Sequence, residues 1–138
     1  MPDIFTKGLS TNSRRWSDLD LDFKAHPVTG DIVTKTDVEA VKRSLRNLIL
    51  TNRYERPFQP EIDSGVNDYL FELATPLTIL NIKSIIRNAI SNFEERVEVI
   101  DIKVYDDIDR NGFNVTIFFN VINTPDPVTV DIFLERLR

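Results

Sequence analysis

Four carboxylates in the middle of the chain are the residues that could carry hydrolytic chemistry. Glycosidases need two carboxyl groups about 5–9.5 Å apart, and one of them must have a raised pKa. The spacing of these four acids along the chain does not separate them from ordinary surface carboxylates. A peptidoglycan-cleaving lysozyme that uses a pair of them is therefore kept only as an alternative. They are Glu55, Glu61, Asp68 and Glu72.

Other catalytic and metal chemistries fit the sequence poorly. The chain has no cysteine, and its one histidine, His26, precedes a proline without a nucleophile motif nearby. Residues 107–112 match the first half of a calcium-binding loop, but the twelfth position is Phe118, where such a loop needs a glutamate. The pair Asn111-Gly112 fits a hairpin turn better. We therefore predict a protein that is not an enzyme and that has no metal site and no cofactor.

A proline-stiffened segment, residues 51–62, is better suited to recognition than to catalysis. Pro57 and Pro60 fix their own φ angles and favour extended conformations in the residues before them. Side chains on a stiff segment lose little conformational entropy on binding. An alternative is a rigid connector in which Phe58 plugs the core and the charges are solvated. The candidate docking residues of this segment are Arg53, Glu55, Arg56 and Phe58.

The same segment belongs to a series of motifs that extends over most of the chain. The motifs are Arg56-Pro57-Phe58, Pro60-Glu61 and Leu70-Phe71-Glu72, preceded by Asp18-Leu19-Asp20-Leu21. With these motifs the chain resembles the small wedge subunit of contractile (myovirus-type) phage-tail baseplates, from Asp18 to the C-terminal strands. That family includes members described as lysozyme-like, and it has relatives in type VI secretion baseplates.

Two positions depart from the pattern of that family. Asp63 stands soon after the Pro-Glu pair, where the family usually has a glycine. Glu94-Glu95-Arg96 stands where many members have Glu-Pro-Arg, so the acid and the arginine remain while the proline is absent. We include Glu94 and Arg96 among the candidate docking residues. If one of the acids instead pairs with an arginine inside the subunit, the motif is structural.

The resemblance implies a structural subunit that binds other baseplate wedge proteins and the tail sheath subunit. Multiple copies would belong to a six-fold baseplate in the virion tail, after assembly in the host cytoplasm. The resemblance also implies that the last strands are similar to the strand-exchange region of the sheath subunit and offer sheath assembly its starting point. Their candidate residues are Val130, Ile132 and Phe133. A cytosolic regulatory adaptor on the same fold is the alternative from a different class.

The composition limits the partners of the chain. A length of 138 residues suits one domain with a core of its own. The net charge of −5 argues against a nucleic-acid binder with a broad basic face. No apolar run approaches the roughly 20 residues of a membrane helix, and we expect no secretory leader. We therefore predict protein partners, with no nucleic acid, no membrane and no small-molecule substrate.

Sequence periodicity predicts the elements that position these residues. Residues 1–35 lack sustained periodicity and are predicted to form an extended N-terminal arm with at most one short strand. Thr36 begins a capping box, which predicts a helix from there to about Leu50. Asn52 is the predicted left-handed residue that stops this helix.

Two further helices and three strands are predicted after this point. Ser64 is predicted to cap a short helix, and Thr75-Pro76 to begin a long one. Beyond Arg96 the apolar period changes to two, which predicts three half-buried strands in an antiparallel meander. Helices followed by strands favour an α+β fold, with the helices on one face of the sheet, in a single domain of residues 36–138. The predicted core residues are Val38, Val41, Leu45, Leu48, Ile49, Val66, Leu70, Leu73, Ile82, Ile85, Ile86, Ala89, Ile90 and Phe93 on helices, and Ile100, Ile102, Val104, Phe113, Val115, Ile117, Phe119, Val121, Val128, Val130, Ile132 and Leu134 on strands.

Overall fold

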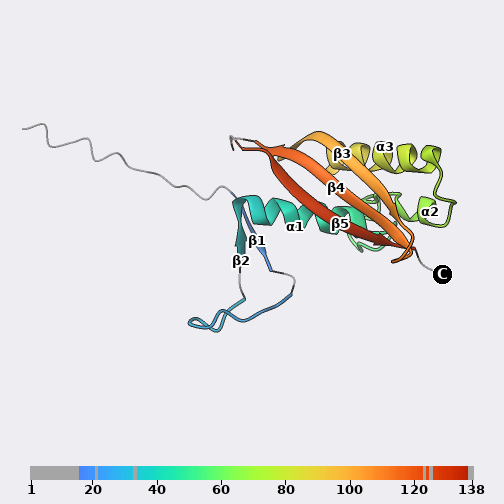
Figure 1. The fold of residues 1–138 in the computed structure, drawn as a ribbon. Helices are drawn as coiled ribbons and strands as arrows, with labels where there is room; N and C mark the ends of the chain where they lie inside the picture. Colours follow the sequence, from blue (N-terminus) through green and yellow to red (C-terminus); the bar gives the residue numbers. More distant parts are fainter. Residues whose placement is uncertain (1–15, 21, 33, 123, 125, 137–138) are drawn as a thin grey trace, which may run out of the picture. The chain divides into compact units, whose positions relative to one another are not determined.

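The computed structural model of the chain describes residues 16–20, 22–32, 34–122, 124 and 126–136 (Figure 1). The chain divides into two compact units, with the division between Ala40 and Val41. Residues 1–15 of the predicted arm lie outside the described residues. The predicted arm-and-domain organisation, with its boundary after residue 35, stays a prediction.

The first unit contains a short hairpin. β1 (Ser17–Leu19) pairs antiparallel with β2 (Thr34–Thr36), where the sequence predicted at most one strand. In the connection between them, the ring Nδ1 of His26 accepts hydrogen bonds from the N–H groups of Val28 and Thr29, at 3.2 and 3.3 Å. His26 therefore has the role of fixing a turn.

α1 (Asp37–Leu50) begins one residue after the predicted start, directly after β2. Its C-terminal end differs from the prediction, because the residue with a positive φ is Tyr54, at +62°, and not Asn52. Thr51 closes the helix instead, since its hydroxyl donates to the carbonyl of Asn47 at 2.5 Å. The buried apolar residues of α1 in the second unit are Val41, Leu45, Leu48 and Ile49.

α2 (Asn67–Leu70) and α3 (Pro76–Phe93) follow. The predicted start of α3 is confirmed, because Oγ1 of Thr75 accepts a hydrogen bond from the N–H of Thr78 at 3.2 Å and Pro76 is the first helical residue. The prediction that Ser64 caps α2 is wrong. Its buried hydroxyl donates to the carbonyl of Ile49 at 2.7 Å and so ties this loop to the last turn of α1.

Two side chains that were predicted to lie in the core of these helices are exposed. Leu73 is 82% exposed, because α2 is only four residues long and ends before it. Phe93 is 40% exposed, as the last residue of α3. The buried stripe of α3 consists of Ile82, Ile86, Ala89 and Ile90.

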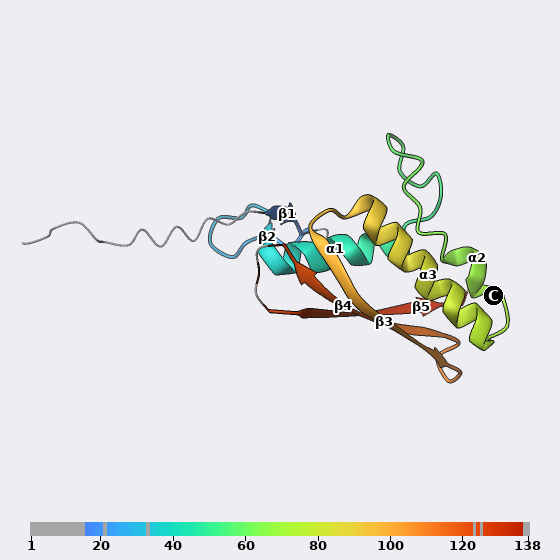
Figure 2. The same cartoon turned by 90° about the horizontal axis from the view of Figure 1, so that it is seen from above.

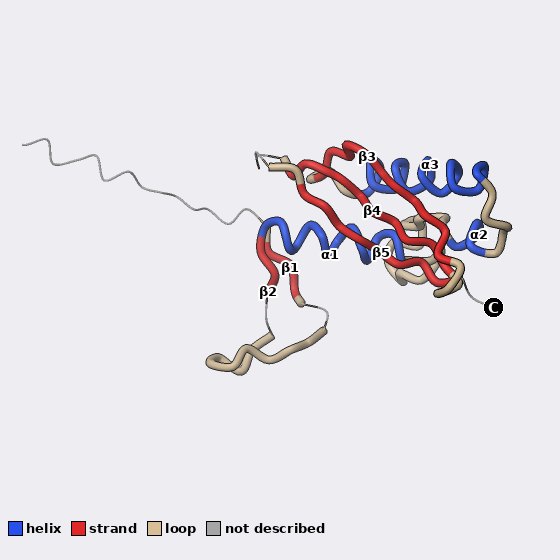
Figure 3. Tube along the Cα trace, viewed as in Figure 1, coloured by secondary structure: helices blue, strands red, loops and turns tan. Residues whose placement is uncertain are grey.

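The sheet of the second unit is the predicted antiparallel meander. β3 (Val97–Asp107), β4 (Gly112–Val121) and β5 (Val128–Glu135) lie in the order β3-β4-β5. Figure 2 shows α3 and the adjoining turns of α1 on the same side of this sheet, and Figure 3 shows how the helices run beside the strands. The predicted α+β fold, with helices on one face of the sheet, is confirmed.

The strands alternate as predicted, with one exception in β3. A bulge between Val99 and Asp101 shifts the register there, and Ile100 is 49% exposed instead of buried. A bulge adds one residue to a strand and so redirects its side chains. The buried side chains of the other two strands are Phe113, Val115, Ile117, Phe119, Val121, Val130, Ile132 and Leu134.

Gly112 is a position where the sheet leaves no room for a side chain. A Cβ there would lie 2.4 Å from the backbone oxygen of Leu134 and 2.6 Å from Cζ of the Phe133 ring. We expect Gly112→Ala to lower the free energy of unfolding by about 1–3 kcal/mol, because the ring and the strand must move apart. Urea unfolding followed by circular dichroism measures this change. The control is Asp109→Ala, at an exposed position of the same turn; an equal loss in both variants would contradict the steric argument.

Candidate partner-binding surfaces

The segment that joins α1 to α2 is an exposed loop, residues 52–61, which we call the docking loop. Figure 2 shows it projecting away from the helices and the sheet. Phe58 is 97% exposed and Tyr54 is 71% exposed. The alternative in which Phe58 plugs the core is therefore wrong. The loop presents both aromatic rings to solvent.

Contacts within the docking loop give it a defined shape. Glu55 accepts a hydrogen bond from the N–H of Asn52 at 2.7 Å, so its carboxylate is used inside the loop. The N–H of Tyr54 donates to the carbonyl of Pro60 at 3.3 Å and closes the base of the loop. The guanidinium of Arg53 lies 5.3 Å from the centroid of the Tyr54 ring, within cation–π distance. These contacts reduce the number of conformations that binding must suppress.

Arg56 is exposed near the middle of this loop. Among the residues that the structure describes, no carboxylate lies within ion-pair distance of Arg53 or Arg56. The internal pairing of Glu55 with Arg56, which the sequence left open, is therefore not formed. Both guanidinium groups can still take a carboxylate from another protein.

Glu94 and Arg96 form the internal pair that the sequence left open. Nε and Nη2 of Arg96 donate to the two carboxylate oxygens of Glu94, at 2.6 and 2.8 Å. The hydroxyl of Ser44, on α1, donates to Oε2 of Glu94 at 2.5 Å. Glu94 is 5% exposed, so the cluster lies where the end of α3 meets α1 and the start of β3. This geometry gives the pair a structural role, and a docking role for Glu94 and Arg96 stays a prediction.

The electrostatics of Glu94 favour its charged form. Burial of the carboxyl raises its pKa, but the hydrogen bonds from Arg96 and Ser44 and the positive charge of Arg96 outweigh burial. The net result is a pKa below the ordinary value of a glutamate. The ionised carboxylate therefore stabilises the folded chain.

Within the described residues β5 is an edge strand, and the ladder shows which of its backbone groups point outward. The N–H of Arg136 donates to the carbonyl of Asn111 at 2.9 Å, which makes these two residues a hydrogen-bonded pair. Hydrogen-bonded and non-hydrogen-bonded pairs alternate along an antiparallel ladder. Every second residue of β5 therefore turns its N–H and C=O away from β4. These residues are Thr129, Asp131, Phe133 and Glu135.

The three predicted residues of β5 occupy two different environments. The side chains of Val130 and Ile132 lie in the core, and their backbone groups pair with β4. Phe133 lies half-buried on the other face of the sheet, where the guanidinium of Arg110 is 4.0 Å from the centroid of its ring. The partner-binding role of Val130 and Ile132 stays a prediction. Phe133 combines outward backbone groups with a side chain outside the core.

Sequence reasoning missed one set of exposed apolar residues between α2 and the second turn of α3. Leu77 and Leu80 lie three residues apart on α3, and so share one face of the helix. That face differs from the buried stripe that contains Ile82 and Ile86. A second apolar spacing on α3 was the available signal in the sequence. The exposed residues are Phe71, Leu73, Leu77 and Leu80.

The candidate catalytic carboxylates lie exposed on the surface, and the candidate calcium-binding residues form part of a turn. Glu55, Glu61, Asp68 and Glu72 are all exposed, whereas the acid of a glycosidase needs an environment that raises its pKa. Asp107 accepts hydrogen bonds from the N–H of Arg110 at 3.1 Å and from the side-chain amide of Asn114 at 2.8 Å, as the anchor of the β3–β4 turn.

The described part of the chain contains neither a metal-binding cluster nor a membrane-spanning helix. No group of three His, Cys, Asp or Glu side chains is arranged there to hold a metal ion. No helix within those residues is both long enough and apolar enough to cross a bilayer.

The lowered pKa of Glu94 gives a pH-dependent prediction. Its stabilising effect is present above the unfolded-state pKa of about 4.3 and is lost as the pH falls through the lower folded-state pKa. Glu94→Gln should therefore lose about 1–3 kcal/mol of unfolding free energy at pH 7, and the difference from the unsubstituted chain should shrink toward pH 3. Urea unfolding at both pH values measures it. Glu95→Gln, at the exposed neighbouring position, is the control; a loss that does not depend on pH would contradict the assignment.

Comparisons with known proteins agree over sequence and fold. The family model described as baseplate wedge protein gp25 matches residues 35–126. Baseplate wedge protein gp25 of Enterobacteria phage T4 is 32% identical over 116 residues, which cover 84% of this chain and 87% of that protein.

Two solved structures have a similar fold at low sequence identity. A chain of the anti-feeding prophage baseplate, solved by cryo-EM, aligns with a TM-score of 0.62 at 22% identity, over 89% of this chain and 87% of that chain. A crystal structure of a Geobacter sulfurreducens protein, provisionally named a tail lysozyme, aligns with a TM-score of 0.59 at 21% identity, over 69% of this chain and 88% of that chain. These two likenesses show the fold alone. The family model and the phage T4 relative show more, and by them this chain belongs to the baseplate wedge protein gp25 family.

Proposed function

We propose that this chain is a structural subunit of the baseplate wedge of a contractile tail and acts by binding other proteins through two surfaces. Family membership supports the baseplate role. The observation that carries the binding mechanism is the 97% exposure of Phe58 on a loop with a defined shape. A large apolar ring fully exposed to water is suited to an interface. The first surface is the docking loop, and the second is the free edge of β5.

The docking loop combines the features of an interface anchor. Aromatic and arginine side chains carry much of the binding energy in many interfaces. Phe58 offers the ring, and Arg53 and Arg56 offer guanidinium groups that can hold a carboxylate with two parallel hydrogen bonds. Two prolines and the internal hydrogen bonds limit the entropy lost on binding. We assign this loop to contacts with other wedge proteins.

The free edge of β5 is suited to strand addition. Four residues of β5 direct backbone donors and acceptors outward, which is the arrangement that an added strand needs. We assign this edge to the tail sheath subunit, whose first ring would begin by adding a strand here. Multiple copies of the chain would then present such edges around a six-fold baseplate in the virion tail. Assembly would take place in the host cytoplasm.

Substitutions in the docking loop should separate binding from folding. Phe58→Ala and Arg56→Ala should leave the thermal midpoint unchanged, because neither side chain has a partner among the described residues. Each should weaken wedge binding by roughly 30-fold, as the loss of an interface hot spot does. Co-purification with co-expressed wedge proteins measures binding. Ile108→Ala removes another highly exposed apolar side chain, from the β3–β4 turn, and is the control. A collapse of the midpoint, or full wedge recovery with both variants, would count against this assignment.

A proline on the edge of β5 should block strand addition without unfolding the sheet. Thr129→Pro removes an outward N–H, and edge strands tolerate proline where the lost N–H faced solvent. We expect this variant to fold, to enter baseplates and to stop sheath growth. Ile132→Pro, by contrast, removes an N–H that pairs with β4 and should disrupt the subunit itself. Electron microscopy of assembled tails measures sheath length, with Thr129→Ala as the control. Sheaths of normal length on Thr129→Pro baseplates would refute the assignment.

A further inference from the structure

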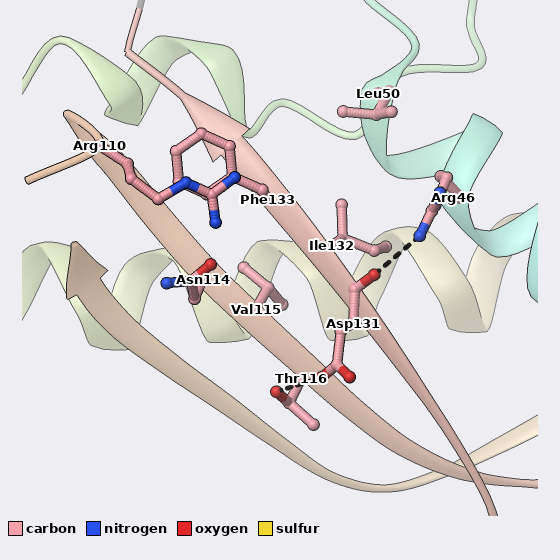
Figure 4. Close-up of a pocket in the computed structure, with 9 residues that line it drawn as sticks. All are labelled: Arg46, Leu50, Arg110, Asn114, Val115, Thr116, Asp131, Ile132 and Phe133. Carbon is pink, nitrogen blue, oxygen red and sulfur yellow. Dashed lines mark hydrogen bonds between the residues drawn. The ribbon is translucent and has the colours of Figure 1, made fainter.

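A groove of about 510 Å³ lies beside β5 and is lined by residues of α1, β4, β5 and the β3–β4 turn (Figure 4). Arg46 and Leu50 line it from α1, and Ile132 and Phe133 line it from β5. Arg110 reaches it from the β3–β4 turn. An incoming strand that pairs with β5 must therefore enter a groove that has an arginine from each side.

Arg46 already occupies one of the outward backbone groups of β5. Its Nη2 donates to the carbonyl oxygen of Asp131 at 3.0 Å, and Figure 4 shows this contact. Asp131 belongs to the alternate residues whose C=O points away from β4. An added strand needs this carbonyl as an acceptor. A strand that pairs along the whole edge must therefore displace Arg46 from this carbonyl or share the oxygen with it.

The second arginine of the groove, Arg110, lies over Phe133, which is two residues after Asp131 on β5. The guanidinium of Arg110 stacks on the Phe133 ring, 4.0 Å from its centroid. Among the described residues, no carboxylate forms an ion pair with Arg46 or Arg110. The carboxylate of Asp131 also lines the groove, but it accepts a hydrogen bond from the hydroxyl of Thr116 at 2.6 Å and points away from Arg46 (Figure 4). Two unpaired cations therefore flank this edge in a chain whose net charge is −5.

We infer that the groove selects an extended partner segment with carboxylates on two neighbouring residues, one for each arginine, and that Arg46 covers the edge until such a segment arrives. The inference rests on the proposed addition of a strand to β5. Arg46 comes from α1, on the buried face of the sheet, whereas Arg110 lies on the opposite face with Phe133. Neighbouring residues of an added strand point to these two opposite faces. A carboxylate on that strand gives Arg46 a new partner when it leaves the carbonyl of Asp131. A neutral strand displaces Arg46 without replacing its partner.

A second copy of this chain fits the groove less well than an acidic partner. The carboxylates of β5 itself, on Asp131 and Glu135, are four residues apart, with Phe133 between them. Both acids lie on the exposed face of the sheet, so two β5 strands that pair edge to edge cannot offer one of them to Arg46 on the buried face. In each copy Arg46 would also cover the carbonyl of Asp131. Edge strands with such covering charges resist self-association.

Peptide titration of the full ¹⁵N-labelled chain tests this inference. The probe is a blocked nine-residue peptide of alternating Thr and Val, in which one central Thr and the Val that follows it are replaced by Glu. Matched peptides carry Gln or Lys at the same places. Amide shifts of Thr129, Asp131 and Phe133 report binding at the edge. We expect the Glu peptide to bind about tenfold more tightly than the Gln peptide, and the Lys peptide to bind most weakly, with smaller differences at high salt.

Variants that remove the two positive charges test whether the preference for the Glu peptide depends on these arginines. In the double variant Arg46→Gln, Arg110→Gln the ratio of the Glu and Gln peptide dissociation constants should fall to about one. The double variant Lys83→Gln, Arg87→Gln makes the same change of charge on α3, which packs on β3, and should keep the tenfold ratio. Circular dichroism confirms that each variant is folded.

The possible failures are distinct. Equal affinity for the Glu and Gln peptides, with shifts at β5, would overturn the acidic preference and leave strand addition intact. No shift at β5 with any of the three peptides would overturn both this inference and the strand-addition part of the proposed function. A concentration-dependent dimer of the chain alone, with shifts at Asp131, would make a second copy the occupant and overturn the acidic partner.

Discussion

The buried carboxylate of Glu94 is the constraint on which the arrangement of the second unit depends. It takes hydrogen bonds from Ser44 on α1 and from Arg96 just before β3, and so joins two helices and the sheet at one point. A buried carboxylate without these partners would be strongly destabilising. The pairing therefore makes one relative placement of α1, α3 and β3 more favourable than the others. The acid and the arginine that family resemblance singled out have a structural part in this subunit.

The position of α1 then determines both proposed binding surfaces. Its last turn leads into the docking loop, and the hydroxyl of Ser64 fastens the far side of that loop to the carbonyl of Ile49. Arg46, on the side of α1, donates a hydrogen bond to the carbonyl of Asp131 on the free edge of β5. The position of α1 is fixed by the contact of Ser44 with Glu94. The helix therefore leads into the docking loop at its C-terminal end and contacts the edge of β5 through Arg46. A shift of α1 would change both surfaces together.

The sequence predicted those features that depend on local periodicity. Alternation of apolar residues predicted β4 and β5 and their buried faces, and Thr75-Pro76 predicted the start of α3. Features that depend on tertiary geometry were not predictable in this way. The bulge that exposes Ile100 breaks a pattern that reads as regular in the sequence.

Two of the binding features depend on contacts between distant residues. The choice between a buried and an exposed Phe58 depends on where the docking loop runs after α1. The contact of Arg46 with Asp131 joins residues 85 positions apart. Local propensity carries no information on either, although a family resemblance predicted the docking residues of the loop as candidates.

Hydrogen exchange with mass spectrometry, on the free chain and on assembled baseplates that contain it, tests the central claim most directly. Burial of the docking loop and pairing of the β5 edge both slow exchange at backbone amides, so the two surfaces report independently. The account predicts new protection in residues 52–61 on wedge assembly, and in residues 128–135 once sheath is added. Protection confined to other segments, with both of these exchanging as fast as in the free chain, would contradict it.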